Sequence, residues 1–505
     1  MTDKLINRKS GILLHPTALP GSYGIGDLGP QAYKFIDDLV EMNQSQWQVL
    51  PLGPTDSSNS PYSLLSVFAG NHQWISFDLL YEDGFLNDEP KNRLPDFNQN
   101  KVEFSKILNV RMKILNEVCH NFKDRPNPKF LIDFEQFKDQ NQYWLDDYAQ
   151  FWAFRTFNGP ESTWINWKTP DKNYLYSESE NCKILQFLFH DQWKRLKSYA
   201  NDNGIKIIGD MPIYAGFESA DVWKNRHLFQ LDENGHMIKQ AGCPPCDYQK
   251  SGQLWGNPLY QWDAHEKLDF SWWKSRFRKL FEMVDRVRLD HFIGYSKYWS
   301  VPMFDNSAKK GWWNKSPGES LFNLLLLEKD RLNLIAEDLG AVDKEVITLR
   351  QKFKFPGMRV LQFEMNDFSL SKIFEQNSVV YTGTHDNDTL VGWLRMNGYE
   401  ESLLEKFNCT NVDLPWSIIQ YALESEADTV IIPLQDILGL GSSARFNTPG
   451  TVSDKNWSWR YSIDNLTKEI KQKMRSLTYQ SKRGIKNKMD EKISREKNNL
   501  DYIKI

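Results

Sequence analysis

Eight short apolar runs in series constrain the fold of this chain more than any other feature. Each run ends in polar residues, glycine or proline, and most are followed by an amphipathic segment of helix length. The runs cover residues 11–15, 47–52, 206–211, 286–291, 334–338, 358–363, 379–384 and 429–434. Periodicity over so few residues does not separate a buried strand from a buried helical segment. Eight strand–helix units in series are nevertheless the pattern of an α/β protein of the (β/α)8 TIM-barrel class.

Two connections between these runs are too long for simple crossovers. Residues 53–205 separate the second run from the third, and residues 213–284 separate the third from the fourth. Structureless loops of that length are uncommon in compact domains, so we expect two large insertion subdomains at the C-terminal face of the strands. We expect residues 1–505 to form a single barrel domain, with a helical C-terminal tail over about residues 464–505.

The charge balance indicates no polyanionic partner. Lys and Arg number 62 and Asp and Glu number 66, which gives a net charge of −4, whereas a nucleic-acid-binding protein is expected to carry a basic surface. The apolar run near the N-terminus is too short for a signal peptide, and no apolar stretch approaches the length of about 18 residues that a membrane span needs. We therefore expect a soluble, cytoplasmic protein with no nucleic-acid or membrane partner; the oligomeric state stays open.

Cysteine usage fits a reducing compartment. The chain has five cysteines, an odd number that does not suggest a disulfide framework. Cys243 and Cys246 form a CPPC motif, but a structural zinc needs four ligands and the other three cysteines are scattered. A thioredoxin-like motif should open a helix, whereas the two prolines and the downstream Gly252 and Gly256 indicate a loop. We interpret the pair as incidental loop thiols and predict no metal and no cofactor; a redox protein is a distant alternative.

Four acidic residues fall at the ends of predicted strands. They close the third, fourth, fifth and seventh runs and are Asp210, Asp290, Glu337 and Asp386. A single acid in such a place often caps the next helix. Four acids at equivalent strand ends would instead converge on the mouth of the barrel, where the active sites of this fold lie.

Two of these acids have the placement of a retaining glycosidase pair. Adjacent strands lie about 4.8 Å apart, so inward-pointing Asp290 and Glu337 would approach to about 5 to 5.5 Å, with one carboxylate attacking carbon and the other protonating the leaving oxygen. Arg288 shares a strand face with Asp290, and a neighbouring guanidinium favours the ionised form that a nucleophile needs. Glu337 must instead carry a proton at neutral pH, which requires burial or nearby negative charge.

Longer motifs run through the chain in a fixed order. They are SGILLHPTALPGSYGIGDLG at residues 10–29, SPYSLLSVFAGN, GQLWGNPLY, DRVRLDHF, AEDLG, GTHDN, IIPLQDILGLGSSARFNTPG, and NWSWR at residues 456–460. In these motifs the chain resembles the 4-alpha-glucanotransferases of the amylomaltase type, glycoside hydrolase family 77 of the alpha-amylase clan. The resemblance implies a retaining double displacement that transfers an α-1,4-glucan segment to the 4-hydroxyl of another glucan or of glucose, in maltodextrin or glycogen metabolism.

The same resemblance implies roles for individual residues. Asp290 would be the nucleophile, Glu337 the general acid/base, and Asp386 a third carboxylate that binds sugar hydroxyls and stabilises the oxocarbenium-like transition state. The implied substrate-binding residues are Arg288, His385 and Asp210 in the donor subsite, Tyr62 as a sugar platform, and Gln253 and Trp255 on the acceptor-side loop.

Some of these residues also have plain structural interpretations. Tyr62 and Trp255 could pack on the protein instead of on a sugar, and His385 could make a strand-end hydrogen bond. The sequence also departs from the family in one place, because Cys246 follows the paired prolines where Asp is common. The fine geometry of the acceptor loop therefore stays open.

Two other functions use the same residues. An α-amylase-like retaining hydrolase would pass the glycosyl group to water instead of to a sugar. A catalytically silent glucan-binding protein could keep the fold without activity, although the intact set of Asp290, Glu337 and Asp386 argues against it. A glucan or maltooligosaccharide is the expected partner in all three cases, and its preferred length is not predicted.

Overall fold

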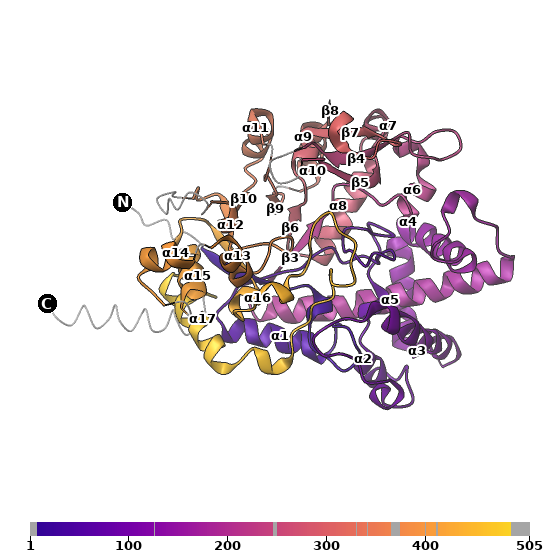
Figure 1. The fold of residues 1–505 in the computed structure, drawn as a ribbon. Helices are drawn as coiled ribbons and strands as arrows, with labels where there is room; N and C mark the ends of the chain where they lie inside the picture. The colour runs from indigo at the N-terminus through magenta and orange to yellow at the C-terminus, as the bar shows by residue number, and fades with distance from the viewer. Residues whose placement is uncertain are drawn as a thin grey trace.

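Eight parallel strands close into a barrel at the centre of this computed structural model (Figure 1), which describes residues 8–125, 127–245, 250–329, 331–340, 342–364, 374–398, 400–410 and 413–485. The order around the barrel is β1-β12-β11-β10-β9-β6-β3-β2. The strands are β1 (Lys9–Leu13), β2 (Gln46–Gln48), β3 (Lys206–Met211), β6 (Arg286–Leu289), β9 (Leu334–Ala336), β10 (Gly357–Val360), β11 (Ser378–Tyr381) and β12 (Thr429–Pro433). Each predicted run overlaps one of them, and the predicted TIM barrel is confirmed.

The strand register sets the height of the acidic residues at the barrel mouth. Asp210 is paired with Arg288 across β3 and β6, and Leu289 is paired with Ala336 across β6 and β9. Asp290 and Glu337 are the next residues on these two strands, so both leave the barrel at the same level. Parallel strands put all their carboxyl ends at one face, which is why acids distant in sequence meet there.

Buried apolar strands and an outer ring of helices form the core. All residues of β11 and β12 are buried, as expected for parallel strands covered on both faces. The outer helices that precede or follow barrel strands are α1 (Pro30–Glu41), α5 (Lys172–Asp202), α8 (Ser271–Met283), α10 (Gly318–Glu328), α11 (Lys344–Lys352), α15 (Leu414–Glu424) and α17 (Lys468–Gln480). In α1, Pro30 occupies the first turn and the buried face carries Phe35, Ile36 and Leu39 at helical spacing.

The strand in the sixth run is shorter than predicted. Residues 358–363 were expected to be extended, but the strand β10 stops at Val360 and the short helix α12 (Leu361–Glu364) begins directly after it. Apolar runs of this length suit a buried helical turn as well as a strand, so the pattern alone does not mark the boundary.

Helices fill the long connection between β2 and β3. They are α2 (Phe77–Glu82), α3 (Phe104–Asp124), α4 (Pro128–Asn158) and α5, whose C-terminal part returns to the barrel and packs against α1. Both α4 and α5 have 31 residues, and they pack along each other. The Asp171 side chain accepts hydrogen bonds from the backbone N–H groups of Asn173 and Tyr174 and so caps the start of α5.

A second sheet lies above β3 and β6 in Figure 1. Its four antiparallel strands have the order β5-β4-β7-β8 and are β4 (Lys239–Cys243), β5 (Gln253–Pro258), β7 (Lys297–Pro302) and β8 (Trp312–Lys315). Three short helices connect to it, α6 (Ala220–Lys224), α7 (Trp262–Lys267) and α9 (Ile293–Ser296). The sequence analysis predicted none of these strands, and half of the sheet comes from the segment after β6.

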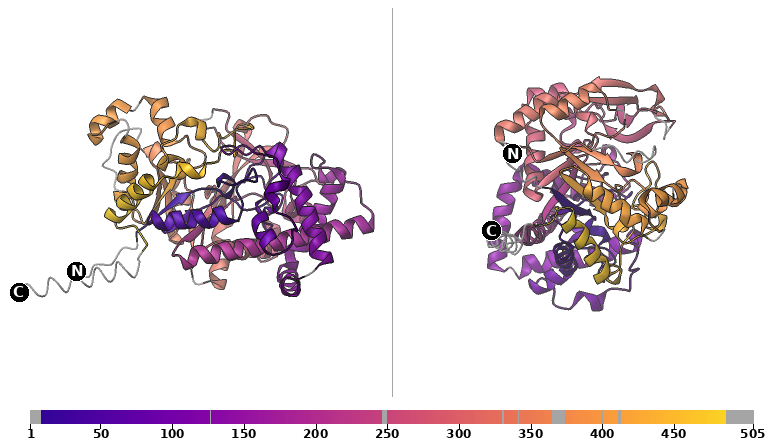
Figure 2. Two further views of the ribbon diagram at one scale, coloured as in Figure 1. Left: turned by 90° about the horizontal axis from the view of Figure 1, so that it is seen from below. Right: turned by 90° about the vertical axis from the view of Figure 1, so that its left-hand side faces the viewer.

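The C-terminal part of the chain packs on the opposite side of the barrel from α3 and α4 (Figure 2). It contains α13 (Leu390–Asn397), α14 (Glu400–Phe407), α15, α16 (Leu434–Ile437) and α17, and α17 packs against α1. The predicted tail therefore contains α17, while residues 486–505 lie outside the described residues. The bounds of the two insertion subdomains stay a prediction. Among the described helices, none is long and apolar enough to span a membrane.

Candidate active site

Arg288 joins two carboxylates at the C-terminal end of the barrel. Its Nη1 donates to Asp210 Oδ1 and Oδ2 at 2.9 and 2.8 Å and lies 2.9 Å from Asp290 Oδ1. The pKa of the buried Arg288 is raised well above its usual value, because the attraction of the two carboxylates outweighs the cost of burial. Burial raises the pKa of Asp210, whereas the guanidinium in contact with both of its oxygens favours its ionised form. Arg288 thus holds a fixed positive charge beside Asp290.

Asp290 is the accessible member of this group. Its side chain is 28% exposed, whereas that of Asp210 is fully buried. The backbone N–H of Asp290 continues the ladder by donating to the carbonyl of Met211 at 3.0 Å, which fixes the residue directly after β6. A carboxylate that is anchored by an arginine and yet reachable from the cleft suits nucleophilic attack.

Glu337 has a different environment. Its two oxygens accept backbone hydrogen bonds, from His291 at 2.7 Å and from Leu339 at 3.2 Å. Burial raises the pKa of Glu337 to about 8, the negative charge of Asp290 adds to this rise, and Arg288 and the two backbone N–H groups oppose it. Glu337 is therefore mostly protonated at neutral pH, as the sequence analysis required of a general acid.

Asp386 lies on another side of the mouth, after β11, which is two strands from β9 in the barrel order. Its Oδ1 accepts a hydrogen bond from Asn447 Nδ2 at 2.7 Å and lies 3.4 Å from His385 Nε2, and its side chain is 47% exposed. Arg445 donates to the backbone carbonyl of Asp386 at 2.7 Å. Asp386 is thus oriented by neighbours and open to the cleft.

Tyr62 and His385 connect these two sides. The Tyr62 hydroxyl donates to Asp210 Oδ2 at 2.8 Å, and its ring stacks on His385 with centroids 5.0 Å apart and planes at 19°. The Trp457 ring lies near both, 6.0 Å from Tyr62 and 5.9 Å from His385. Burial lowers the pKa of His385, so its ring is neutral at neutral pH. Tyr62 therefore packs on the protein in part, and its use as a sugar platform stays a prediction.

Gln253 and Trp255 were expected on a loop, which is wrong: both lie on the strand β5, which Gly256 interrupts without ending it. Trp255 contacts the segment after β6. Trp255 Nε1 donates to Gln253 Oε1 at 2.9 Å, and the Trp255 ring packs edge-on against the His291 ring with centroids 4.8 Å apart. The second sheet thus extends toward Asp290 and Glu337. Cys246, where the sequence departs from the family, lies outside the described residues, so the structure tests neither that departure nor a pairing with Cys243. Within the described residues, no group of three or more His, Cys, Asp or Glu side chains is arranged to hold a metal ion.

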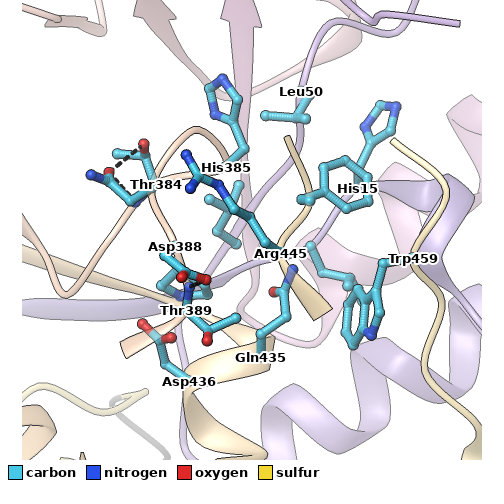
Figure 3. Close-up of a pocket in the computed structure, with 15 residues that line it drawn as sticks. His15, Leu50, Thr384, His385, Asp388, Thr389, Gln435, Asp436, Arg445 and Trp459 are labelled. Atoms are coloured by element: carbon cyan, nitrogen blue, oxygen red, sulfur yellow. Dashed lines mark hydrogen bonds between the residues drawn. The ribbon is translucent and has the colours of Figure 1, made fainter. Parts of the chain in front are cut away.

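A narrow pocket adjoins the Asp386 side of the site (Figure 3). It is lined by His385, Thr384, Arg445 and residues from the ends of β1 and β12. His15 also lines it, and both nitrogens of its buried ring lack a hydrogen-bond partner among the described residues. Burial lowers the pKa of His15 to about 3, so the His15 ring is uncharged at neutral pH.

Sequence reasoning missed several residues of this arrangement. Arg445, Asn447 and Trp457 orient or flank Asp386 and His385 and come from the segment after β12. The ARFNTPG part of a quoted motif contains two of them, but nothing in the local pattern showed that they reach Asp386. His291 was missed because its contribution is a backbone N–H, which has no signature in the side-chain pattern.

Comparison with known proteins identifies the family. The model of glycoside hydrolase family 77, described as 4-alpha-glucanotransferase, matches residues 14–466. The chain belongs to this family. It is 42% identical over 491 residues to a 4-alpha-glucanotransferase from Synechocystis sp., with 92% of this chain and 95% of that protein covered, and 40% identical over 494 residues to one from Streptococcus pneumoniae, with 93% and 96% covered.

A solved structure agrees with this assignment. The amylomaltase from Streptococcus agalactiae in complex with acarbose superposes with a TM-score of 0.89 at 33% identity, and the match covers 94% of this chain and all of that one. The predicted family, fold and 4-alpha-glucanotransferase activity are therefore confirmed. The curated relatives carry the transferase description, which favours this activity over the hydrolase and the silent binding protein.

Proposed function

We propose that this 4-alpha-glucanotransferase works by a retaining double displacement in which Asp290 is the nucleophile and Glu337 the general acid/base. The observation that carries the assignment is the contrast between the two carboxyl groups. Asp290 is held by the guanidinium of Arg288, whereas Glu337 is anchored by two backbone N–H groups, and desolvation of its carboxyl group raises its pKa to about 8. Environments of this kind separate nucleophile from acid in carboxylate pairs.

In the first step Asp290 attacks the anomeric carbon of the donor glucan. The glycosidic C–O bond breaks, the proton of Glu337 passes to the leaving oxygen, and a glycosyl ester forms on Asp290. In the second step Glu337, now a carboxylate, takes the proton of an acceptor 4-hydroxyl, whose oxygen attacks the same carbon and releases Asp290. Two inversions give net retention, and the proposed mechanism uses no metal or cofactor.

The remaining residues bind the sugars. Asp386, held by Asn447 and His385, would bind hydroxyls of the donor sugar and stabilise the oxocarbenium-like transition state. Arg288, Asp210, His385 and Tyr62 would line the donor subsite, and Gln253 and Trp255 would contact the acceptor. The acarbose complex of the related amylomaltase supports a binding cleft in this fold.

The proposed partner is a maltooligosaccharide or longer glucan, with no nucleic-acid or membrane partner. We keep the cytoplasmic location as a prediction. We also propose that the insertions at 53–205 and 213–284 build the acceptor side of the cleft. Transfer competes with hydrolysis only if binding energy orients the acceptor, and oriented proximity contributes about 7 to 11 kcal/mol in favourable cases.

The product spectrum from pure maltotriose tests this function. A transferase remakes each bond that it breaks, so we expect glucose together with a ladder of longer maltooligosaccharides and a nearly constant number of reducing ends. A hydrolase would raise the number of reducing ends in step with maltotriose loss and would give no longer product. A silent binding protein would leave maltotriose intact.

A further inference from the structure

The residue after the proposed nucleophile has an unusual backbone conformation. His291 has φ of 49°, in the left-handed region that residues other than glycine adopt infrequently, with asparagine, aspartate and histidine the commonest among them. The chain turns there out of β6, and the carbonyl of His291 accepts from the N–H of Gly294 at 2.9 Å. At the start of this turn the N–H of His291 donates to Oε2 of the Glu337 side chain at 2.7 Å.

The imidazole ring of His291 is closely held. It packs edge-on against Trp255 at 4.8 Å and 85° between the planes. On another side Gly294 lies close to the ring, because a Cβ added to it would lie 3.3 Å from His291 Cδ2.

The ring of His291 acts by packing and carries no charge. Burial lowers its pKa to about 4, and its Nε2 is buried without a hydrogen-bond partner among the described residues. The ring contact that the structure shows for His291 is its packing against Trp255. Its closest described ring is Trp255, on the second sheet.

We infer that His291 is a positioning residue for the general acid/base: its left-handed turn holds the peptide whose N–H anchors Glu337, and its ring, packed against Trp255, keeps that turn in place. The inference rests on the proposed role of Glu337. It also links the proposed acceptor strand β5 to the proton-transferring group through one residue, so displacement of Trp255 would reach Glu337 through a chain of direct contacts.

The anchoring N–H has a chemical consequence for the reaction. Glu337 alternates between protonated and ionised forms, and a hydrogen bond donated to the carboxyl group favours the ionised form. The charged groups that act on Glu337 are Arg288, which opposes the rise of its pKa, and Asp290, which adds to it. Loss of the His291 N–H would therefore raise the pKa of Glu337 and misplace its proton.

Two variants separate the effect of the His291 backbone conformation from the effect of its ring. His291→Ala removes the ring and disfavours the left-handed conformation, whereas His291→Gly removes the ring and favours that conformation. Lys354→Ala is the matched control, because Lys354 has φ of 55° and an exposed side chain before β10. The readout is the ratio of kcat/KM for maltotriose to kcat/KM for α-glucosyl fluoride, whose leaving group needs little protonation.

We expect this ratio to fall about tenfold or more in His291→Ala, about threefold in His291→Gly, and not at all in Lys354→Ala, as misplacement of a general acid predicts. The alkaline limb of the maltotriose pH profile should move to higher pH in His291→Ala and less in His291→Gly. If His291→Ala does not fold, the threefold fall and the shift in His291→Gly carry the test.

Two results would overturn the inference. One is an unchanged ratio in both variants, which includes equal losses for both donors. The other is a fall in His291→Gly as large as that in His291→Ala. Failure of the proposed function is recognised separately with Glu337→Gln. If that variant loses as much rate with the fluoride as with maltotriose, Glu337 is not the acid and the role of His291 falls with it.

Discussion

The carboxyl groups that follow the neighbouring strands β6 and β9, those of Asp290 and Glu337, have opposite surroundings. Asp290 faces a guanidinium that is itself locked to the buried Asp210, and its side chain stays 28% exposed. Glu337 has no cationic hydrogen-bond partner among the described residues; two backbone N–H groups hold it, and burial raises its pKa to about 8. The comparison teaches that the two proposed roles come from neighbours, because strand register alone would make these positions equivalent.

Removal of the proposed nucleophile should have the largest effect on activity. Asp290→Ala is expected to lower kcat for maltotriose by at least about 10⁴-fold, because the ester has no other place to form. Arg288 keeps its contact with both oxygens of Asp210, so the melting temperature should stay near that of the unchanged protein. Transfer within tenfold of the original rate would show that another group attacks the sugar.

Removal of the proposed general acid should slow the reaction strongly only for donors whose leaving group needs a proton. Glu337→Gln keeps the shape and loses the proton, so kcat/KM for maltotriose should fall by about 10² to 10⁴-fold. Glycosylation by α-glucosyl fluoride should be nearly spared, since fluoride leaves without protonation. Single-turnover rates with both donors measure this difference, and similar losses would remove Glu337 from the acid role.

The pH profile of the unchanged protein should also differ between maltotriose and α-glucosyl fluoride. The first step needs protonated Glu337, and its pKa is raised, so the rate with maltotriose is expected to be retained through neutral pH and to fall as the pH rises past about 8. Above that limb the fall approaches about tenfold per pH unit. With α-glucosyl fluoride the alkaline limb of glycosylation should be much weaker; a limb of equal depth with both donors would assign it to another group.

The smallest effect is expected at Cys243, the last residue of β4, and at Cys246. Replacing both by Ser should leave maltotriose transfer within about threefold, since the proposed chemistry uses no thiol. The same preparation, analysed for metals before and after the substitution, should contain no stoichiometric zinc. Zinc in the original protein that is lost from the variant would establish a site that the loop chemistry does not predict.

The barrel was predictable because its strands are buried on both faces. Runs such as TVIIP in β12 are continuously apolar, and their carboxyl ends define where catalytic acids gather. The second sheet was not predicted, because its strands carry interruptions such as Gly242 and Gly256 and are partly exposed, so they lack an apolar run.

The residues of the active site also differ in how well the sequence predicts them. Asp290 and Glu337 could be placed from strand ends, and the structure brings both beside Arg288 and His291. Asn447 reaches Asp386 across 61 residues of chain, and the contribution of His291 depends on a positive φ angle. Neither a long-range side-chain contact nor a single left-handed residue leaves a local pattern, which is why the orienting groups were found only in the structure.

Trapping of the glycosyl ester tests the central claim most directly. Glu337→Gln, mixed with α-glucosyl fluoride, should still form the ester but lack the base that activates an acceptor, so the adduct should accumulate. Intact-mass spectrometry followed by peptide mapping is expected to find one glucosyl group, attached to Asp290. A glucosyl group on Asp210 or Asp386 instead, or consumption of the fluoride donor with no adduct on any residue, would contradict the proposed division of roles between Asp290 and Glu337.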